Sequence, residues 1–205
     1  MISYLTYDEI LSMMKLSTSI IDEELREQII SGIEIFQDAL DYHTANVIID
    51  IDKTNLMDYP TCREYLNNSS KVIIGVDTIG EKVSYLIHSE GENGNYILSM
   101  IYDFIANYYI AEYHCKQIKE TRAKMELENK YLSHEIVPGN NEDIVMQKEI
   151  FKHLSTEYVK LTDSYLMLPA KSLSYVFGIT NLKDNSEIMH NCSECMSRNC
   201  MYRKK

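Results

Sequence analysis

The chain has 205 residues, 45% of them hydrophobic, and a formal net charge of −11. This length and composition suffice for one hydrophobic core and are short for two, so they predict a single domain. The acidic excess argues against nucleic acid or an anionic lipid surface as main partner, because both favour clustered lysine and arginine. The first residues do not resemble a signal peptide, and no segment approaches the roughly 18 apolar residues of a membrane span. We therefore expect a cytoplasmic protein.

The first part of the chain predicts helices around two strands. A short helix is expected over 7–15 and a longer one over 22–42, where large apolar residues recur every three to four positions. The run 47–51 predicts a strand, and Pro60 suits the first position of a short helix. The run 71–76 is almost continuously apolar and rich in β-branched residues, which is typical of a central strand with both faces covered.

A second group of helices follows this strand. One is expected over 81–89, and a much longer one from residue 96 to beyond residue 124. Its apolar stripe lasts only about three heptads, which favours a core helix over a coiled coil. The stretch 116–130 is mostly charged, so we expect the second half of the long helix to leave the core.

The clearest loop contains Pro138 and Gly139, followed by two asparagines. These residues favour turns and tolerate positive φ angles. A helix is expected over 142–157, and a cluster of short strands follows between residues 159 and 179. Helices interleaved with strands that cluster late in the chain predict an α+β domain, with one mixed or antiparallel sheet and helices packed against it. We assign residues 1–181 to this domain and residues 182–205 to a cysteine-rich tail.

The tail contains a group of soft metal ligands, namely His190, Cys192, Cys195 and Cys200. Thiolates this close together can hold zinc or an iron–sulfur cluster, and the reducing cytoplasm favours a metal over disulfides. A tail with incidental cysteines is the alternative. A structural zinc usually takes its ligands from two separated pairs, whereas these come from one loop. The spacing therefore predicts a metal site without distinguishing zinc from iron–sulfur.

The fourth ligand of such a site is open between His190, Cys62, Cys115, water and a partner residue. Cys62 and Cys115 are isolated in the sequence. Isolated cysteines usually behave as small apolar side chains. We expect both to be buried in the core.

Three stretches of the sequence together carry a family resemblance. They are 65–80 with the following long helix that contains Ala111 and Glu112, then 137–139 with 146–151, and finally 161–178. In this order and spacing they resemble the activation domain of cobalamin-dependent methionine synthase. The chain is more closely similar to small free-standing versions from anaerobic bacteria that end in a similar cysteine-rich tail. The resemblance covers nearly the whole chain.

The resemblance implies a single α+β domain with a twisted, mainly antiparallel sheet and flanking helices. Such a domain binds S-adenosylmethionine on a shallow surface and docks over a cobalamin that a partner presents. An external electron and the methyl group of S-adenosylmethionine then restore methylcobalamin from the inactive cob(II) state, while the protein mainly positions the two cofactors. The implied function is an accessory protein for the reductive reactivation of a corrinoid-dependent methyltransferase or methionine synthase.

The loop pattern of the family is Arg-x-x-Pro-Gly-Tyr, in which the arginine helps to hold the carboxylate of S-adenosylmethionine and the tyrosine lies toward the corrinoid. Pro138 and Gly139 match this pattern, whereas Glu135 stands in the arginine position and Asn140 in the tyrosine position. A glutamate repels a carboxylate that an arginine would bind. The neighbouring His134 can partly compensate. For Gly139, a plain turn and a close approach to a ligand are both open.

Glu112 matches an acidic residue of the family that can face the amino group of S-adenosylmethionine; a solvated glutamate on a helix surface is the alternative. Two functions therefore stand beside each other. The first is a reactivation factor that uses S-adenosylmethionine as methyl donor, with a tail cluster that can supply the electron. The second is a non-catalytic module that binds a corrinoid protein or carries a metal and has lost S-adenosylmethionine binding.

Overall fold

The computed structural model of the protein describes residues 4–15 and 21–182. The helices are α1 (Tyr7–Met14), α2 (Glu23–Ala39), α3 (Pro60–Tyr65), α4 (Glu81–Glu92), α5 (Tyr96–Leu127) and α6 (Gln147–His153), with short 3₁₀ turns η2 (Ile51–Lys53), η3 (Leu56–Asp58) and η4 (Ile144–Met146). The strands are β1 (His43–Asp50), β2 (Lys71–Thr78), β3 (Tyr131–Leu132), β4 (Lys160–Leu161), β5 (Met167–Leu168) and β6 (Ser172–Thr180).

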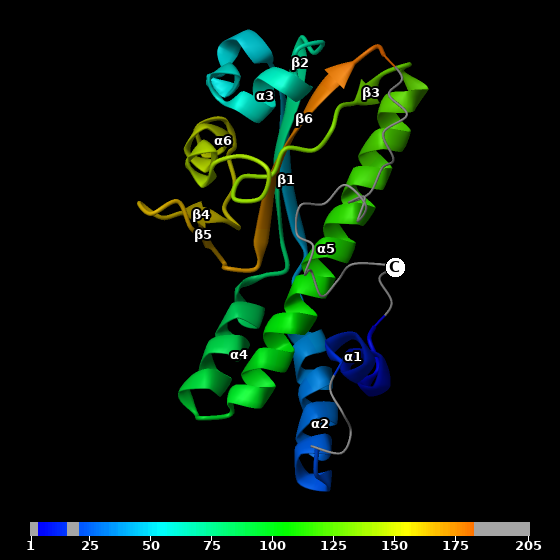
Figure 1. Cartoon of the computed structure of the whole chain (residues 1–205), viewed down its shortest axis with the longest axis vertical. Helices are drawn as coiled ribbons and strands as arrows, with labels where there is room; N and C mark the ends of the chain where they lie inside the picture. Colours follow the sequence, from blue (N-terminus) through cyan, green and yellow to red (C-terminus); the bar gives the residue numbers. More distant parts are fainter. Residues whose placement is uncertain (1–3, 16–20, 183–205) are drawn as a thin grey trace.

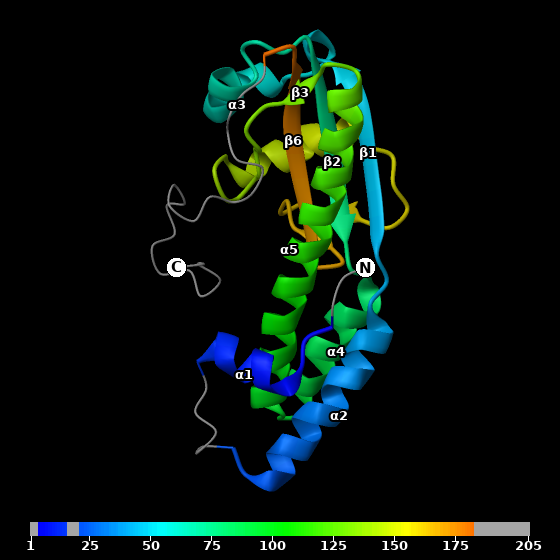
Figure 2. The ribbon, with the colours of Figure 1, turned by 90° about the vertical axis from the view of Figure 1, so that its right-hand side faces the viewer.

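The molecule is elongated, with a sheet at one end and a group of helices at the other (Figure 1). The main sheet has the strand order β1-β2-β6-β3 and is antiparallel throughout, while β4 and β5 form a small separate hairpin. Helix α5 runs the length of the molecule and belongs to both ends (Figure 2). An α+β domain with an antiparallel sheet and flanking helices is thus confirmed.

The sheet is covered on both faces. Alternate residues of a strand point to opposite faces, so that Ile74 packs with the helices α3 and α6, whereas Ile73 lies under α5. Both side chains are buried. Figure 2 shows α5 in front of β2 and β6, with α3 and α6 behind the sheet. The continuous apolar run of β2 therefore does mark a central strand. Strand β1, on the outer side of β2, begins at His43, earlier than predicted.

The helical end is built on the first half of α5. Helices α1, α2 and α4 pack around it, with Phe36 and Ile101 fully buried between them. Gly32 allows α2 to approach α5 closely, because a side chain there would collide with the Tyr102 hydroxyl. Helix α2 begins after Asp22, whose carboxylate accepts a hydrogen bond from the Leu25 amide at 2.8 Å. Such a cap satisfies one of the free amides at a helix N-terminus.

The second half of α5 is mostly exposed but keeps contact with the sheet, so the prediction that it leaves the core is only partly right. Ile118 is buried and packs against Ile73 and Phe177. Ile118 and the half-buried Met125, seven residues apart along one side of the helix, keep contact with the sheet while most of the charged residues face water. The helix predicted over 142–157 is also shorter, because it is divided into η4 and α6. Within the described ranges, no helix is both long and apolar enough to cross a lipid bilayer.

Candidate functional site

A buried histidine joins two carboxylates where α5 crosses the sheet. His114 Nδ1 lies 2.7 Å from Asp77 Oδ2 on β2, and its Nε2 lies 2.5 Å from Glu135 Oε1 in the segment after β3. Asp77 is fully buried and the His114 side chain is 7% exposed, whereas the Glu135 side chain is 27% exposed. Three ionisable side chains from distant parts of the sequence thus form one hydrogen-bonded chain from the core to the surface, here called the His114 chain.

The charges of the His114 chain favour a protonated histidine. Burial lowers the pKa of His114, but its hydrogen bonds to the Asp77 and Glu135 carboxylates, together with their negative charges, outweigh burial and raise the pKa to about 9. Near neutral pH both ring nitrogens therefore donate a hydrogen bond. With both carboxyl groups ionised, the His114 chain carries one net negative charge.

Hydroxyl groups form hydrogen bonds at the inner end of the His114 chain. Asp77 Oδ1 lies 2.5 Å from Thr44 Oγ1, which also lies 2.9 Å from the Tyr113 hydroxyl. Thr44 has a single proton and directs it to the carboxylate, so Tyr113 is the donor in the second bond. The Tyr175 ring packs against the imidazole, with 4.9 Å between ring centroids. It occupies the space over Gly75, where any side chain would collide with the ring.

A bulge in the edge of the sheet directs Glu135 toward His114. Leu132 pairs with Ile179 and Ile136 pairs with Val176, so that four steps along the edge match three steps along β6. One extra residue changes the face to which the following side chains point. Leu132 accordingly packs on the α5 face, and Ile136 packs in the core on the opposite face. The bulge lets Glu135 reach α5 from a segment that otherwise belongs to the sheet edge.

The loop after the bulge is fixed by its own side chains. Asn141 donates from Nδ2 to the Glu135 carbonyl at 2.8 Å and accepts at Oδ1 from the Val137 amide at 2.8 Å. Glu142 accepts a hydrogen bond from the Thr61 amide in the first turn of α3 at 2.8 Å. Glu135 is therefore held from its backbone as well as from its side chain.

The Pro138–Gly139 turn has the geometry of a plain turn. Gly139 has a φ of +82°, and its amide donates to the Glu142 carbonyl at 2.8 Å. A Cβ atom there would approach Ile144 no closer than 3.8 Å, so the backbone conformation, not a lack of space, requires glycine. Pro138 is buried and Asn140 is exposed. The turn interpretation accounts for Gly139 without a ligand.

The other residues of the predicted ligand site are divided between two places. His134 is exposed and lies beside the Tyr65 ring, with 5.0 Å between centroids. Glu112 precedes His114 by two residues, so its side chain leaves α5 about 200° around the helix from His114. It lies near Tyr108, whose pKa is raised by burial first and then by the charges of Glu112 and Glu9. The structure therefore places His134, Glu135 and the turn together but separates Glu112 from them.

The predicted metal ligands His190, Cys192, Cys195 and Cys200 lie outside the described residues. Within 4–15 and 21–182, no group of three or more His, Cys, Asp or Glu side chains could hold a metal ion. Cys62 is fully buried, as predicted, and burial raises the pKa of its thiol to about 12. A thiol in this environment resists the deprotonation that metal binding needs. Cys115 is only partly buried.

Asp77 and His114 were not predicted as site residues from the sequence. The signal was present, since Asp77 interrupts a strand that is otherwise apolar on both faces. A buried carboxylate needs a partner. His114 is four residues from both Ile110 and Ile118, which are buried, and therefore shares the inward side of α5 with them. The bulge that brings Glu135 to this pair left no comparable pattern in the sequence.

The fold and the His114 chain define an α+β protein with an antiparallel sheet and a buried carboxylate–histidine–carboxylate chain. Comparison with protein-family models found no match, and comparison with curated proteins found none either. The resemblance to the activation domain of methionine synthase therefore stays a prediction.

Proposed function

We propose that this chain is an accessory protein of a corrinoid-dependent methyltransferase or methionine synthase, and that it contacts the corrinoid-carrying partner without holding S-adenosylmethionine at the Pro138–Gly139 turn. The sequence resemblance supports this class of accessory protein. The antiparallel α+β fold, which is of the kind that the resemblance implies, supports it as well. The hydrogen bond between Glu135 and His114 carries the second half of the proposal.

This hydrogen bond matters because it engages His114, so that His114 cannot stand in for the arginine that the family pattern has at the position of Glu135. Both ring nitrogens of His114 are already engaged, by Asp77 and by Glu135. A ligand carboxylate beside Glu135 therefore meets a negative charge without a free cationic donor from His114. At 4 Å and an effective dielectric constant near 20, such a repulsion costs at most about 4 kcal/mol, because the protonated His114 offsets part of the charge of Glu135. This upper limit corresponds to roughly a thousandfold loss of affinity.

Calorimetric titration with S-adenosylmethionine tests this point. We expect no binding tighter than about 1 mM to the wild-type chain. S-Adenosylhomocysteine, which lacks the sulfonium charge but keeps the amino-acid end, serves as the matched ligand. Tighter binding of either compound would overturn the proposal that the site has been lost.

A reactivation factor that does use S-adenosylmethionine is the second candidate. The match of Pro138 and Gly139 to the loop pattern of the family favours it. The two candidates share the partner, a corrinoid-binding protein or methyltransferase loaded with cob(II)alamin. Co-sedimentation with such a protein tests the shared part, and the titration above separates the two.

The tail belongs to the proposal as a metal carrier, with zinc or an iron–sulfur cluster held by Cys192, Cys195, Cys200 and His190. Anaerobic purification followed by metal and acid-labile sulfide analysis tests it. Iron with sulfide supports electron delivery to the corrinoid, whereas zinc alone leaves a structural role. A metal-free protein would contradict both.

A further inference from the structure

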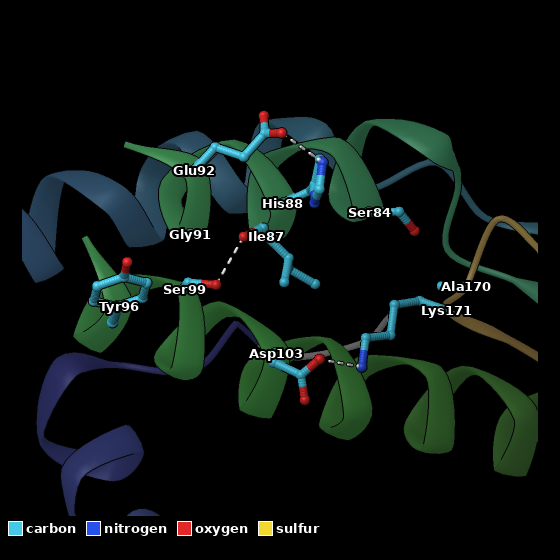
Figure 3. A pocket seen from close by; sticks show the side chains of 10 residues that line it. All are labelled: Ser84, Ile87, His88, Gly91, Glu92, Tyr96, Ser99, Asp103, Ala170 and Lys171. Atoms are coloured by element: carbon cyan, nitrogen blue, oxygen red, sulfur yellow. Dashed lines mark hydrogen bonds and ion pairs between the residues drawn. The ribbon is translucent and has the colours of Figure 1, made fainter. Parts of the chain in front are cut away.

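A groove lies between α4, α5 and the residues that lead into β6, and none of its lining residues belongs to the His114 chain (Figure 3). Its volume is about 460 Å³. Small-molecule sites commonly have volumes of roughly 300–1,000 Å³. The groove is therefore large enough for a metabolite, and its two ends differ in chemistry.

One end holds a fixed pair of opposite charges. Lys171 Nζ lies 2.7 Å from Asp103 Oδ1 and donates to Asn107 Oδ1 at 2.8 Å. The Lys171 side chain is 14% exposed, whereas that of Asp103 is 50% exposed. Asn107 also donates to Asp103 Oδ2 at 3.2 Å. The ammonium and the carboxylate are thus held in place, and the pair remains accessible from the groove.

The other end is aromatic. Tyr96 lies seven residues before Asp103 on α5, which places it about 10 Å away along the helix axis. It is 74% exposed, and Ile87 lines the groove between the two ends. Figure 3 shows Ile87 extending from α4 into the space above α5, with Asp103 below it, Lys171 on one side and Tyr96 on the other. On the rim, His88 Nε2 lies 3.1 Å from Glu92 Oε1.

The charges select the class of ligand. A simple anion would meet the carboxylates of Asp103 and Glu92, and a simple cation would meet Lys171. A zwitterion can add to both members without breaking their contact, since the third proton of Lys171 can be donated to its carboxylate while the half-exposed Asp103 carboxylate accepts from its ammonium. The apolar part of such a ligand then covers Ile87, and an aromatic ring at its far end can stack on Tyr96.

We propose that this groove binds an aromatic α-amino acid, with its zwitterionic head at Lys171 and Asp103 and its ring against Tyr96. The proposal is independent of corrinoid docking and of the Pro138–Gly139 turn, because it uses other residues and another class of ligand.

L-Tryptophan is a suitable probe because the chain contains no tryptophan, so the indole fluorescence reports the ligand alone. We expect a saturable change with a dissociation constant of about 1 mM or lower. Tryptamine lacks the carboxylate, and N-acetyl-L-tryptophan lacks the ammonium. Each should bind at least about tenfold more weakly, because each makes one charged hydrogen bond fewer to the pair.

Two variants assign the charges to their residues. Lys171→Met should abolish the preference for L-tryptophan over tryptamine, and Asp103→Asn should abolish the preference over N-acetyl-L-tryptophan. Lys82→Met is the matched control, because Lys82 is exposed on α4 but does not line the groove. A merely structural effect would weaken all three ligands equally.

The proposal is overturned if L-tryptophan gives no saturable change up to about 10 mM, or if it binds no better than both analogues. If a variant fails to fold, as seen by circular dichroism, the comparison of the three ligands on the wild-type chain still decides. Unchanged preferences in both folded variants would also overturn it.

Discussion

The two ends of the molecule carry their charges in different ways. The helical end, residues 4–15, 21–41 and 81–103, has thirteen acidic and three basic residues, a net charge of −10. The sheet end, residues 42–80 and 104–182, has fifteen acidic and twelve basic residues, a net charge of −3. In the helical end the core is apolar or aromatic and the charges lie outside it. In the sheet end, the charged side chains of the His114 chain lie in the core.

This difference separates two kinds of stability. Burial of apolar surface tolerates changes of pH, whereas buried ionic groups are costly unless every partner is present. The sheet end should therefore be sensitive to single polar substitutions and to pH, and the helical end should respond mainly to changes in its packing and its helix caps. The predictions below test this contrast, beginning with the largest effect.

Replacement of His114 by alanine should destabilise the protein by about 3–5 kcal/mol, because it leaves Asp77 buried without its cation. Urea denaturation measures the change. His88→Ala is the matched control, since that side chain is 72% exposed and its partner Glu92 is also on the surface. We expect the control to lie within about 0.5 kcal/mol of the wild type. Equal effects of the two substitutions would show that the His114 chain contributes nothing.

Raising the pH should weaken the sheet end selectively. The pKa of His114 is about 9 in the folded protein, above its ordinary value of 6.5. The folded state therefore binds this proton more tightly, and the resulting stability is fully present below about pH 6.5 and is lost as the pH rises through about 9. At about 1.4 kcal/mol per pKa unit, we expect a loss of roughly 3 kcal/mol across this range.

His114→Gln should flatten that pH dependence, because glutamine does not titrate. Denaturation curves at several pH values measure the slope in each protein. An NMR titration of the His114 ring provides a second measurement that does not depend on the stability of the variant. A ring that loses its proton near pH 6.5 would contradict the stabilisation by Asp77 and Glu135.

Substitution of Gly139 tests the rigid loop of the sheet end. Alanine at a φ of +82° is strained by its Cβ atom, at a cost of about 1–2 kcal/mol. Asparagine tolerates this region better and should recover part of the loss. The free energy of unfolding of both variants measures the effect. A loss as large for asparagine as for alanine would indicate that a steric contact, and not the backbone angle, requires glycine.

The fold was predictable where one local pattern decides one element. The apolar run of β2 and the spacing of large apolar residues in α2 identified a central strand and an amphipathic helix. The course of α5 was harder to predict, because single apolar residues such as Ile118 keep a largely charged segment on the sheet. The spacing of apolar residues shows which face of a helix is apolar, but it does not show which part of the molecule packs against that face.

The site was less predictable because it depends on contacts between distant residues. Glu135 was identified as a site residue through a family pattern, yet its partner His114 is 21 residues away and reaches it through a one-residue bulge. Such a bulge is decided by the pairing of the whole edge strand, not by the residues in it. The groove at Lys171 likewise needs the packing of α4 on α5 before its lining residues come together.

The smallest effect is expected at the helical end, where one exposed cap sets the start of α2. Asp22→Ala removes the hydrogen bond to the Leu25 amide and should cost about 1 kcal/mol. Asp38→Ala is the matched control, because it removes an exposed carboxylate from the last turn of the same helix, where the helix dipole disfavours negative charge. We expect this control to be neutral or slightly stabilising. Urea denaturation at neutral pH measures the free energy of unfolding of both variants. A larger loss of stability for Asp38→Ala than for Asp22→Ala would show that acidic side chains on the surface make stabilising contacts. It would contradict the view that the helical end depends mainly on its packing and its helix caps.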